Sequence, residues 1–362
     1  MNILPLFKKK ALPVLLPNTE KLNLEKTLSN SLDLKNPLVL YGEERLAVLD
    51  IRAQTAELNR NNLTRTEAYL AFYLKHPEIH WSFLAHMVSR NGGYSMTDLK
   101  NGIVGQFLPE KEIIALFQFL ETANALIFHD AYPQLMLYEK SLLFGRPLFH
   151  LLPALNVSRF MMPIWEMFFK KRHSDVLTLA LITNEQHYVE NQLLSKSSGI
   201  LKTFPYALQE KCGLTNVVFP YKKHFYDKKY SLAGMEVDNF IKPEARIKIG
   251  KILYQTLFHP AVFNEALLFS THTPHTGSRS DYWPHLFSAA KEKQKFQSPK
   301  LLDAWEDVHH TFHRYSDWLL NIDLISDFDV FPHTGTYKDI TKNVKMNLLK
   351  MSSLHLIAKK IF

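Results

Sequence analysis

The sequence contains little cysteine and little glycine, and it lacks a long hydrophobic run. Its 362 residues include one cysteine, Cys212, which excludes an intramolecular disulfide. That absence fits a reducing compartment, although a secreted protein without disulfides would show the same count. The 12 glycines are few for a fold with many tight β-turns, so the composition favours helices. No segment reaches the roughly 18 apolar residues of a membrane span. We therefore predict a soluble, cytoplasmic, all-α protein.

The positive charge is concentrated at the two ends of the chain. Of the formal net charge of +8, residues 1–10 contribute +3 through three lysines, and residues 338–362 contribute +5 through six lysines and Asp339. The part between them is neutral on balance, whereas a protein that grips nucleic acid with its folded body carries a basic surface there. Residues 344–362 also place apolar side chains at helical intervals. The end of the chain could therefore contact an anionic membrane peripherally through 338–362, dock a partner, or pack back onto the body.

Helix signals occur along most of the chain. Thr64 and Glu67 form a capping-box pattern that predicts a helix up to Leu74, and Gly92-Gly93 predicts the end of the next helix at Arg90. Further helices are expected to start at Ser95 and at Pro109-Glu110. The remaining predicted helices cover 134–144, 157–171, 175–195, 205–211, 243–257, 261–270, 284–294 and 299–321.

Together these patterns predict a single multi-helical domain. Segment 216–242 lacks a helical pattern and is expected to be an irregular loop or a short hairpin, and residues 271–283 are expected to form a long polar loop. No Gly- or Ser-rich linker divides the chain. We divide it into an N-terminal arm of 1–44, a helical domain of 45–330 and a basic amphipathic C-terminal segment of 331–362.

Polar groups on one strongly apolar helix are the first candidates for a functional site. In the predicted helix from Glu78 to Arg90, apolar residues cover the whole circumference, which places His80, His86 and Arg90 in or beside the core. Buried polar groups need partners, which could be backbone carbonyls or a ligand. We treat His80 and His86 as candidate catalytic groups, and Arg90 with Asn91 as a candidate anion-binding fork.

Glu185 lies in the middle of the apolar side of the predicted helix 175–195. A carboxylate in that position must be paired, protonated or bound to something. Glu166 occupies a similarly apolar run, and Asp130 is a weaker example. Such residues could form an acid/base pair or hold a metal, while structural ion pairs with Arg or Lys would explain them equally well. We take Glu185 as the main catalytic candidate.

The predicted helix 299–321 has a polar face opposite its apolar stripe. Glu306 and His309 on that helix show the Glu-x-x-His spacing of di-iron sites in helical bundles, but those sites need two copies and the sequence has one. His310 lies on the same polar face. A solvated face is the better interpretation, and we predict no metal site.

The predicted polar loop 271–283 continues as a polar segment up to residue 285. This segment also contains the aromatic residues Tyr282 and Trp283. Its Gly277-Ser278-Arg279 sequence precedes a predicted helix start and suits an anionic group, through backbone N–H donors and a guanidinium. Its histidines lack zinc-ligand spacing. The candidate ligand-binding residues of this loop are His275, Ser278, Arg279 and Asp281.

Four strings of the sequence resemble the YppC-like proteins, a bacterial family of unknown function. They lie at residues 59–69 (NRNNLTRTEAY), 76–91 (starting HPEIHW), 129–135 (HDAYPQL) and 275–285 (starting HTGSR). The likeness spans roughly 45–330 and leaves both basic ends outside. None of the strings is a standard catalytic signature. The resemblance implies a bacterial protein and carries over no activity and no site residue.

Two kinds of function fit these observations. In the first, a polar pocket in the helical body binds a small anionic ligand or acts as an enzyme; it is built from His80, His86, Arg90, Glu185 and the 271–285 loop. In the second, the chain is a non-enzymatic interaction protein whose basic termini contact a membrane surface, nucleic acid or a protein partner. The first requires the polar groups to converge on one cavity. The sequence defines neither a cofactor nor whether the protein is an enzyme.

Overall fold

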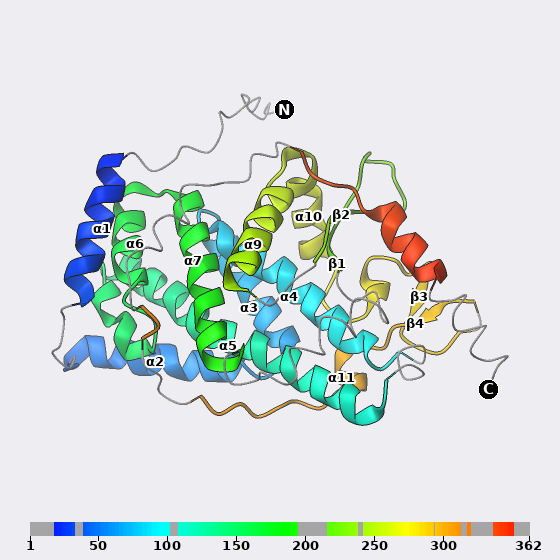
Figure 1. Ribbon diagram of the computed structural model, residues 1–362, viewed down its shortest axis with the longest axis horizontal. Helices are drawn as coiled ribbons and strands as arrows, with labels where there is room; N and C mark the ends of the chain where they lie inside the picture. The colour runs from blue at the N-terminus through cyan, green and yellow to red at the C-terminus, as the bar shows by residue number, and fades with distance from the viewer. Residues whose placement is uncertain are drawn as a thin grey trace.

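Helices make up most of the chain in the computed structural model, and two small sheets join them (Figure 1). The structure describes residues 18–32, 39–101, 108–194, 216–237, 242–292, 294–312, 317–319 and 336–350. The N-terminal elements are α1 (Asn18–Leu32), α2 (Gly42–Leu58), α3 (Asn62–Lys75), α4 (His80–Asp98), α5 (Glu110–Leu143), the 3₁₀ helix η2 (Phe149–Leu155), α6 (Met161–Lys171), α7 (Ser174–Val189) and the π-helical turn η3 (Glu190–Leu194). The C-terminal elements are β1 (Asn216–Tyr221), β2 (Ser231–Glu236), α9 (Pro243–Leu257), α10 (Pro260–His272), η4 (Arg279–Asp281), β3 (Phe287–Ser288), β4 (Phe296–Gln297) and α11 (Leu301–Ala304).

The helices share one main hydrophobic core. Its buried side chains run from Leu24 in α1 to Val344 near the end of the described chain. Helix α4 lies at the centre, where it contacts α3, α5, α7 and α9. Figure 1 shows α1 and α6 at one end of the molecule, and the β1–β2 hairpin with the helical residues 341–350 at the other. The all-α single-domain prediction is therefore confirmed, with two two-stranded sheets added.

Segment 216–242 contains a hairpin, which is one of the two predicted alternatives. Strands β1 and β2 pair antiparallel, with Val218 opposite Gly234. Gly234 has a φ of +153°, and a Cβ there would lie 2.0 Å from the Val217 carbonyl oxygen. Only glycine fits this close approach of two backbones.

The described part of the C-terminal segment packs onto the hairpin. Asp339 bridges to Ala233, and the backbone N–H of Ile340 donates to the Leu232 carbonyl at 2.9 Å. Ile340 and Val344 are buried in the core. Three roles were predicted for this segment: contact with a membrane, docking of a partner, and packing onto the body. The described part of the segment packs onto the body. Residues 1–17 and 351–362, which carry much of the basic charge, lie outside the described residues.

The predicted start of α3 is wrong by three residues. The helix begins at Asn62 and is capped by Asn61, whose side chain accepts from the Thr64 backbone N–H at 3.1 Å. Thr64 therefore occupies the third helical position of the capping box, and its hydroxyl accepts from the Asn61 N–H at 3.3 Å. Asparagine is as good an N-cap as threonine, so the local pattern permitted both starts.

The predicted end of a helix at Gly92-Gly93 is also wrong. Helix α4 runs without a break to Asp98, so no new helix starts at Ser95. A Cβ on Gly93 would lie 2.4 Å from Oδ1 of Asn62 and 2.6 Å from Nε2 of His275. Glycine costs about 1 kcal/mol in a helix relative to alanine. Here it lets α3 and the 271–285 loop approach α4.

Two further predicted helices are absent. In place of the helix 299–321, α11 covers only four residues, and residues 305–312 form an extended segment. The Trp305 ring stacks on Phe117 at 3.9 Å, and its indole N–H donates to the Met96 carbonyl at 2.8 Å. These contacts hold the backbone extended despite its helical periodicity. In place of the helix 284–294, the chain forms turns and the short strand β3.

Helix α5 continues through Pro133, so the helix predicted separately at 134–144 is its C-terminal part. The predicted helices 243–257 and 261–270 match α9 and α10 closely. The helix predicted at 205–211 lies outside the described residues.

Candidate functional site

The 271–285 loop is fastened to α4 by a buried ion pair. Nε and Nη2 of Arg279 both lie 2.7 Å from Oδ2 of Asp98, and Nη1 donates to the Tyr282 hydroxyl at 2.6 Å. The Ser278 hydroxyl donates to the Ser298 carbonyl at 2.5 Å. The Arg279 guanidinium, predicted to hold an anion, is thus occupied by a carboxylate of the same chain.

A second set of contacts joins the loop to the middle of α4. Nη1 of Arg90 donates to the Thr273 carbonyl at 2.8 Å, and Nη2 lies 3.6 Å from Asp281. The Asp281 carboxylate also accepts from the Thr276 hydroxyl at 2.6 Å. Nε2 of His275 lies 2.9 Å from Oδ1 of Asn62, and burial lowers the pKa of His275 to about 4. The predicted residues of the loop and Arg90 are therefore brought together in a loop-to-helix contact whose polar groups satisfy one another.

Asn91 supports the hairpin. Its side-chain oxygen accepts from the Val218 backbone N–H at 2.9 Å, and its side-chain nitrogen donates to the Val218 carbonyl at 2.9 Å. This amide pairs with β1 in the way a neighbouring strand would. Both ends of the predicted anion-binding fork, Arg90 and Asn91, thus hold backbone groups.

The two candidate histidines on α4 lie in different surroundings. Nδ1 of His80 is 2.8 Å from the Tyr254 hydroxyl, which donates to Asp175 at 2.6 Å. His86 is buried, with Nδ1 at 2.8 Å from the Thr66 carbonyl. Burial and the nearby charge of Arg90 hold the pKa of His86 well below its usual range, so the ring is neutral.

Glu185 lines a partly open cavity of about 170 Å³ between α3, α4, α5, α7 and α9. Most of the lining is apolar; it includes Leu84, Val88, Ile127, Ile182, Ile249 and Leu253. The Gln186 side chain donates to Oε1 of Glu185 at 3.1 Å, and within the described chain no cation pairs with this carboxyl. Burial raises the pKa of Glu185 to about 8, although hydrogen bonds from Gln186 and Trp81 act in the opposite direction. At neutral pH the carboxyl therefore carries its proton.

Tyr69 lines the same cavity from α3. Its side chain is 3% exposed, and its hydroxyl has no hydrogen-bond partner within the described chain. Burial and the proximity of Glu185 raise the pKa of Tyr69 well above its ordinary value, so the hydroxyl keeps its proton. The cavity thus presents two protonated oxygen groups in a mostly apolar wall, whose other polar side chains are Ser89, Asn124, Gln186 and Arg246, the last paired with Glu190.

Asp130 extends this protonated cluster into the core. Its Oδ2 accepts from Asn184 at 2.6 Å and from Gln134 at 2.9 Å, while its buried Oδ1 has no partner within the described chain. Burial, together with the nearby Glu185, raises the pKa of Asp130 well above its usual range. A neutral carboxyl avoids the large cost of an unpaired buried charge.

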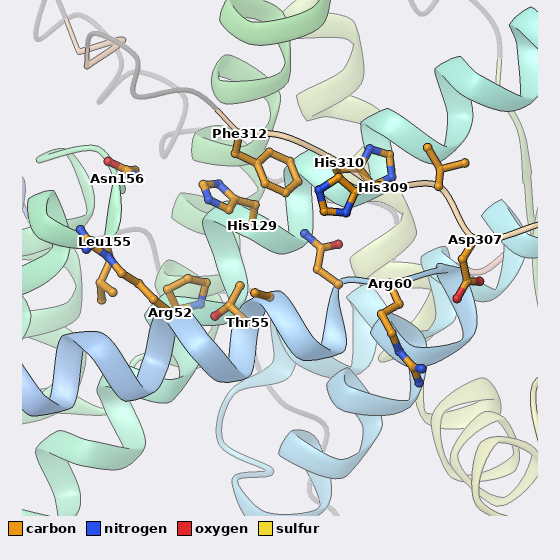
Figure 2. Close-up of a pocket in the computed structure, with 14 residues that line it drawn as sticks. Arg52, Thr55, Arg60, His129, Leu155, Asn156, Asp307, His309, His310 and Phe312 are labelled. Atoms are coloured by element: carbon orange, nitrogen blue, oxygen red, sulfur yellow. The ribbon is translucent and has the colours of Figure 1, made fainter.

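A larger cleft of about 530 Å³ opens between α2, α5 and the extended segment 305–312 (Figure 2). Figure 2 shows His129 and Phe312 side by side, with His309 and His310 next to them and Arg60 extending away from the centre. The His129 and Phe312 rings stack at 4.1 Å. Burial, and to a lesser degree the charge of Arg52, lowers the pKa of His129 to about 4.

His310 connects this cleft to a buried ion pair. Its Nε2 lies 3.1 Å from Oε1 of Glu121, and the other carboxylate oxygen accepts from Nη2 of Arg65 at 2.5 Å. Nη1 of Arg65 donates to the Asn59 side chain at 3.1 Å. Glu121 and Arg65 are buried. Of the polar residues that were predicted to face solvent, His310 therefore contacts the buried Glu121.

The predicted residues do not surround one common cavity. Of those proposed for a single pocket, only Glu185 lines the cavity that contains it. Sequence reasoning did not select Tyr69 or Glu121, and it assigned His310 to solvent. For Tyr69 and Glu121 the available signal was a polar group on an otherwise apolar helix face, the same signal that selected Glu185.

The described residues contain neither a group of three or more His, Cys, Asp or Glu side chains able to hold a metal ion nor a helix long and apolar enough to cross a membrane.

The chain is similar in sequence to proteins of one known family. The family described as "Protein of unknown function (DUF2515)" matches residues 57–352. "Uncharacterized protein YppC" of Bacillus subtilis (strain 168) is 43% identical over 234 residues, which cover 64% of this chain and 71% of that protein. No solved structure matches the chain significantly.

Proposed function

The chain belongs to the DUF2515 family, and from the geometry of its own cavity we propose that it binds a small molecule with an apolar body and a hydrogen-bond-accepting oxygen. The apolar body occupies the cavity between α3, α4, α5, α7 and α9. The oxygen accepts hydrogen bonds from Tyr69 and Glu185. This proposal replaces the anionic ligand expected from the sequence, because the arginines that suggested an anion are occupied by Asp98, by Asp281 and by backbone carbonyls.

The observation that carries the proposal is the Tyr69 hydroxyl. It lines the cavity, it is buried, and it lacks a partner within the described chain. Leaving a buried hydroxyl without a hydrogen bond costs about 1–3 kcal/mol. The hydroxyl oxygen is closed off in this structure, so a ligand oxygen that displaces the adjoining side chains to reach it would remove that cost and would gain specificity from it.

The size and lining of the cavity define the rest of the ligand. Small-molecule sites are mostly apolar and contain a few convergent polar groups. An apolar cavity of about 150 Å³ is large enough for benzene, and this cavity measures about 170 Å³. The ligand is therefore about the size of a single ring with a short substituent.

The protonated state of Glu185 selects the ligand's polar group. A carboxylic acid kept neutral by an apolar site can donate a hydrogen bond, and a tyrosine beside it can donate a second one to the same oxygen. A ketone or carboxylic oxygen matches two donors. A carboxyl with a pKa of about 8 is also suited to proton transfer near neutral pH, so the same contact would serve a reaction at a carbonyl.

The proposal is tested with two probes of nearly equal shape, acetophenone and ethylbenzene, bound to the full-length chain at pH 6.5. Titration calorimetry and saturation-transfer NMR measure the affinities. We expect acetophenone to bind about 30-fold more tightly, because two additional hydrogen bonds contribute about 1 kcal/mol each. Tyr69→Phe should reduce this difference to the roughly fivefold effect of the remaining Glu185 bond and leave ethylbenzene binding unchanged.

A cavity-filling variant provides the second arm. Ala85 lines the cavity, and Ala85→Leu should abolish binding of both probes. Ala56 lines the larger cleft, and Ala56→Leu is the matched control that should bind them normally. Equal affinity of the two probes for the unmodified chain, or unchanged binding by Ala85→Leu, would overturn the proposal.

Two predictions from the sequence are kept as proposals beside this one, and the ligand-binding role predicted for a third set of residues is replaced by a structural one. The single cysteine supports a cytoplasmic location. The division into 1–44, 45–330 and 331–362 stays a prediction. For Arg90, Asn91 and the loop residues, we propose that they act by holding the 271–285 loop and the hairpin on α4.

A further inference from the structure

The cleft in Figure 2 contains a histidine arranged as a proton acceptor, and this arrangement is independent of the cavity at Glu185. We propose that His310 is a general base that takes a proton from a ring-containing molecule bound in this cleft. The partners of its two ring nitrogens and the surfaces around it support this role.

The first ring nitrogen is fixed by a buried carboxylate. Nε2 of His310 lies 3.1 Å from Glu121, which is 2% exposed and forms an ion pair with Arg65. An ionised carboxylate can only accept hydrogen bonds, so the neutral imidazole carries its proton on Nε2. A carboxylate that orients a histidine in this way also stabilises the charged ring after protonation.

The second ring nitrogen is available. In the neutral ring Nδ1 then holds the lone pair, and it has no hydrogen-bond partner within the described chain. Nδ1 is not one of the unpaired polar atoms that are closed off from solvent, so a small molecule has access to it. Because His310 lines the cleft, a bound molecule can reach this nitrogen.

The surfaces next to His310 favour a molecule with an apolar ring. Phe312 and His129 form a stacked aromatic pair, and Leu155 and Pro133 add aliphatic surface to the lining of the cleft. A volume of about 530 Å³ lies within the range of small-molecule sites. Neutral His129 contributes no charge that would repel an imidazolium at His310.

The proposed step moves one proton. A C–H or O–H bond of the ligand breaks, its electron pair stays with the ligand, and the proton bonds to Nδ1 of His310. The imidazolium that forms is neutralised by Glu121, which keeps its ion pair with Arg65. The step needs no oxidant, reductant or cofactor.

A reaction that depends on a base alone provides the test. 5-Nitrobenzisoxazole loses a proton from carbon to a base; the C–H electron pair forms the nitrile, the N–O bond breaks, and a coloured phenolate is released. The full-length chain should accelerate this elimination above an equal concentration of free imidazole. General bases contribute about 100-fold or more, so His310→Gln should lower the protein-dependent rate by about that factor.

The choice of glutamine separates catalysis from anchoring of the 305–312 segment. The amide of the introduced glutamine would still donate a hydrogen bond to Glu121 but has no basic nitrogen. Unfolding midpoints of the variant and the parent chain should therefore agree within a few degrees. His272→Gln changes an exposed histidine of α10 that does not line the cleft and is the matched control, with an unchanged rate expected. A rate for His310→Gln within about twofold of the parent, or an equal loss in His272→Gln, would overturn the proposal, as would a parent rate no higher than that of imidazole.

Discussion

Replacing Glu185 with glutamine should make the protein more stable at neutral pH. Glutamine has nearly the same shape as glutamate and keeps an oxygen that can accept from Gln186 and Trp81. It cannot ionise. The substitution therefore removes the titration of one half-buried group and leaves the lining of the cavity almost unchanged.

The magnitude follows from the different proton affinities of the folded and unfolded states. In the unfolded chain the Glu185 carboxyl loses its proton near its ordinary pKa of 4.5, whereas in the folded chain burial holds the pKa at about 8. Between these values the folded state binds more protons, so raising the pH favours unfolding. Each pH unit in this window lowers the free energy of unfolding by about 1.4 kcal/mol. At pH 7 the unmodified chain has thus lost about 3 kcal/mol of its free energy of unfolding, and Glu185→Gln does not undergo this loss.

Urea unfolding of both chains at pH 5, 6, 7 and 8 measures this difference. We expect the two free energies of unfolding to lie within about 1 kcal/mol at pH 5 and to diverge steadily up to pH 8. Glu57 lies exposed on α2, and Glu57→Gln controls for the loss of a surface carboxylate. Parallel curves for the parent and Glu185→Gln would refute the reasoning, because they would show that Glu185 ionises alike in both states.

Three other substitutions test separate parts of the structure, each by urea unfolding. Tyr69→Phe removes a buried hydroxyl that has no partner within the described chain, so we expect no loss of stability; a loss above about 1 kcal/mol would show that the hydroxyl is bonded. Arg279→Met leaves the Asp98 carboxylate buried without its partner and should cost about 3–5 kcal/mol; adding Asp98→Leu should recover much of this cost, and no recovery would contradict a direct pairing. Gly93→Ala places a Cβ 2.4 Å from a neighbouring side-chain oxygen and should cost more than about 2 kcal/mol. Gly92→Ala, with a nearest contact of 3.2 Å to a side chain, is its matched control and should change stability by less than about 1 kcal/mol; equal effects would contradict the close approach at position 93.

The helices that were predicted accurately are those with local end signals. The prediction 243–257 coincides with α9, which has a proline at its first position. The prediction 261–270 falls inside α10, which starts in the same way with Pro260. A proline at that position lacks only an N–H that would be unpaired anyway. Such signals act within one turn of the chain, so the sequence contains them completely.

The failed predictions share a different origin. Gly92-Gly93 resembles a helix end but lies inside α4, because another part of the chain passes beside it. Residues 305–312 have helical periodicity but lie extended, because Trp305 and His310 find their partners on α4 and α5. In both cases tertiary contacts outweighed a weak local preference.

By itself, the sequence determined that the protein is helical, that its charge lies at the ends, and that Glu185 stands on an apolar helix face; these follow from composition and from side chains close together in the chain. Only the tertiary structure decided which polar groups are satisfied and which are available. Arg279 meets Asp98 across 181 residues, and His310 meets Glu121 across 189. A buried polar group is structural or reactive according to its partner, and partners so distant in sequence are brought together only by packing.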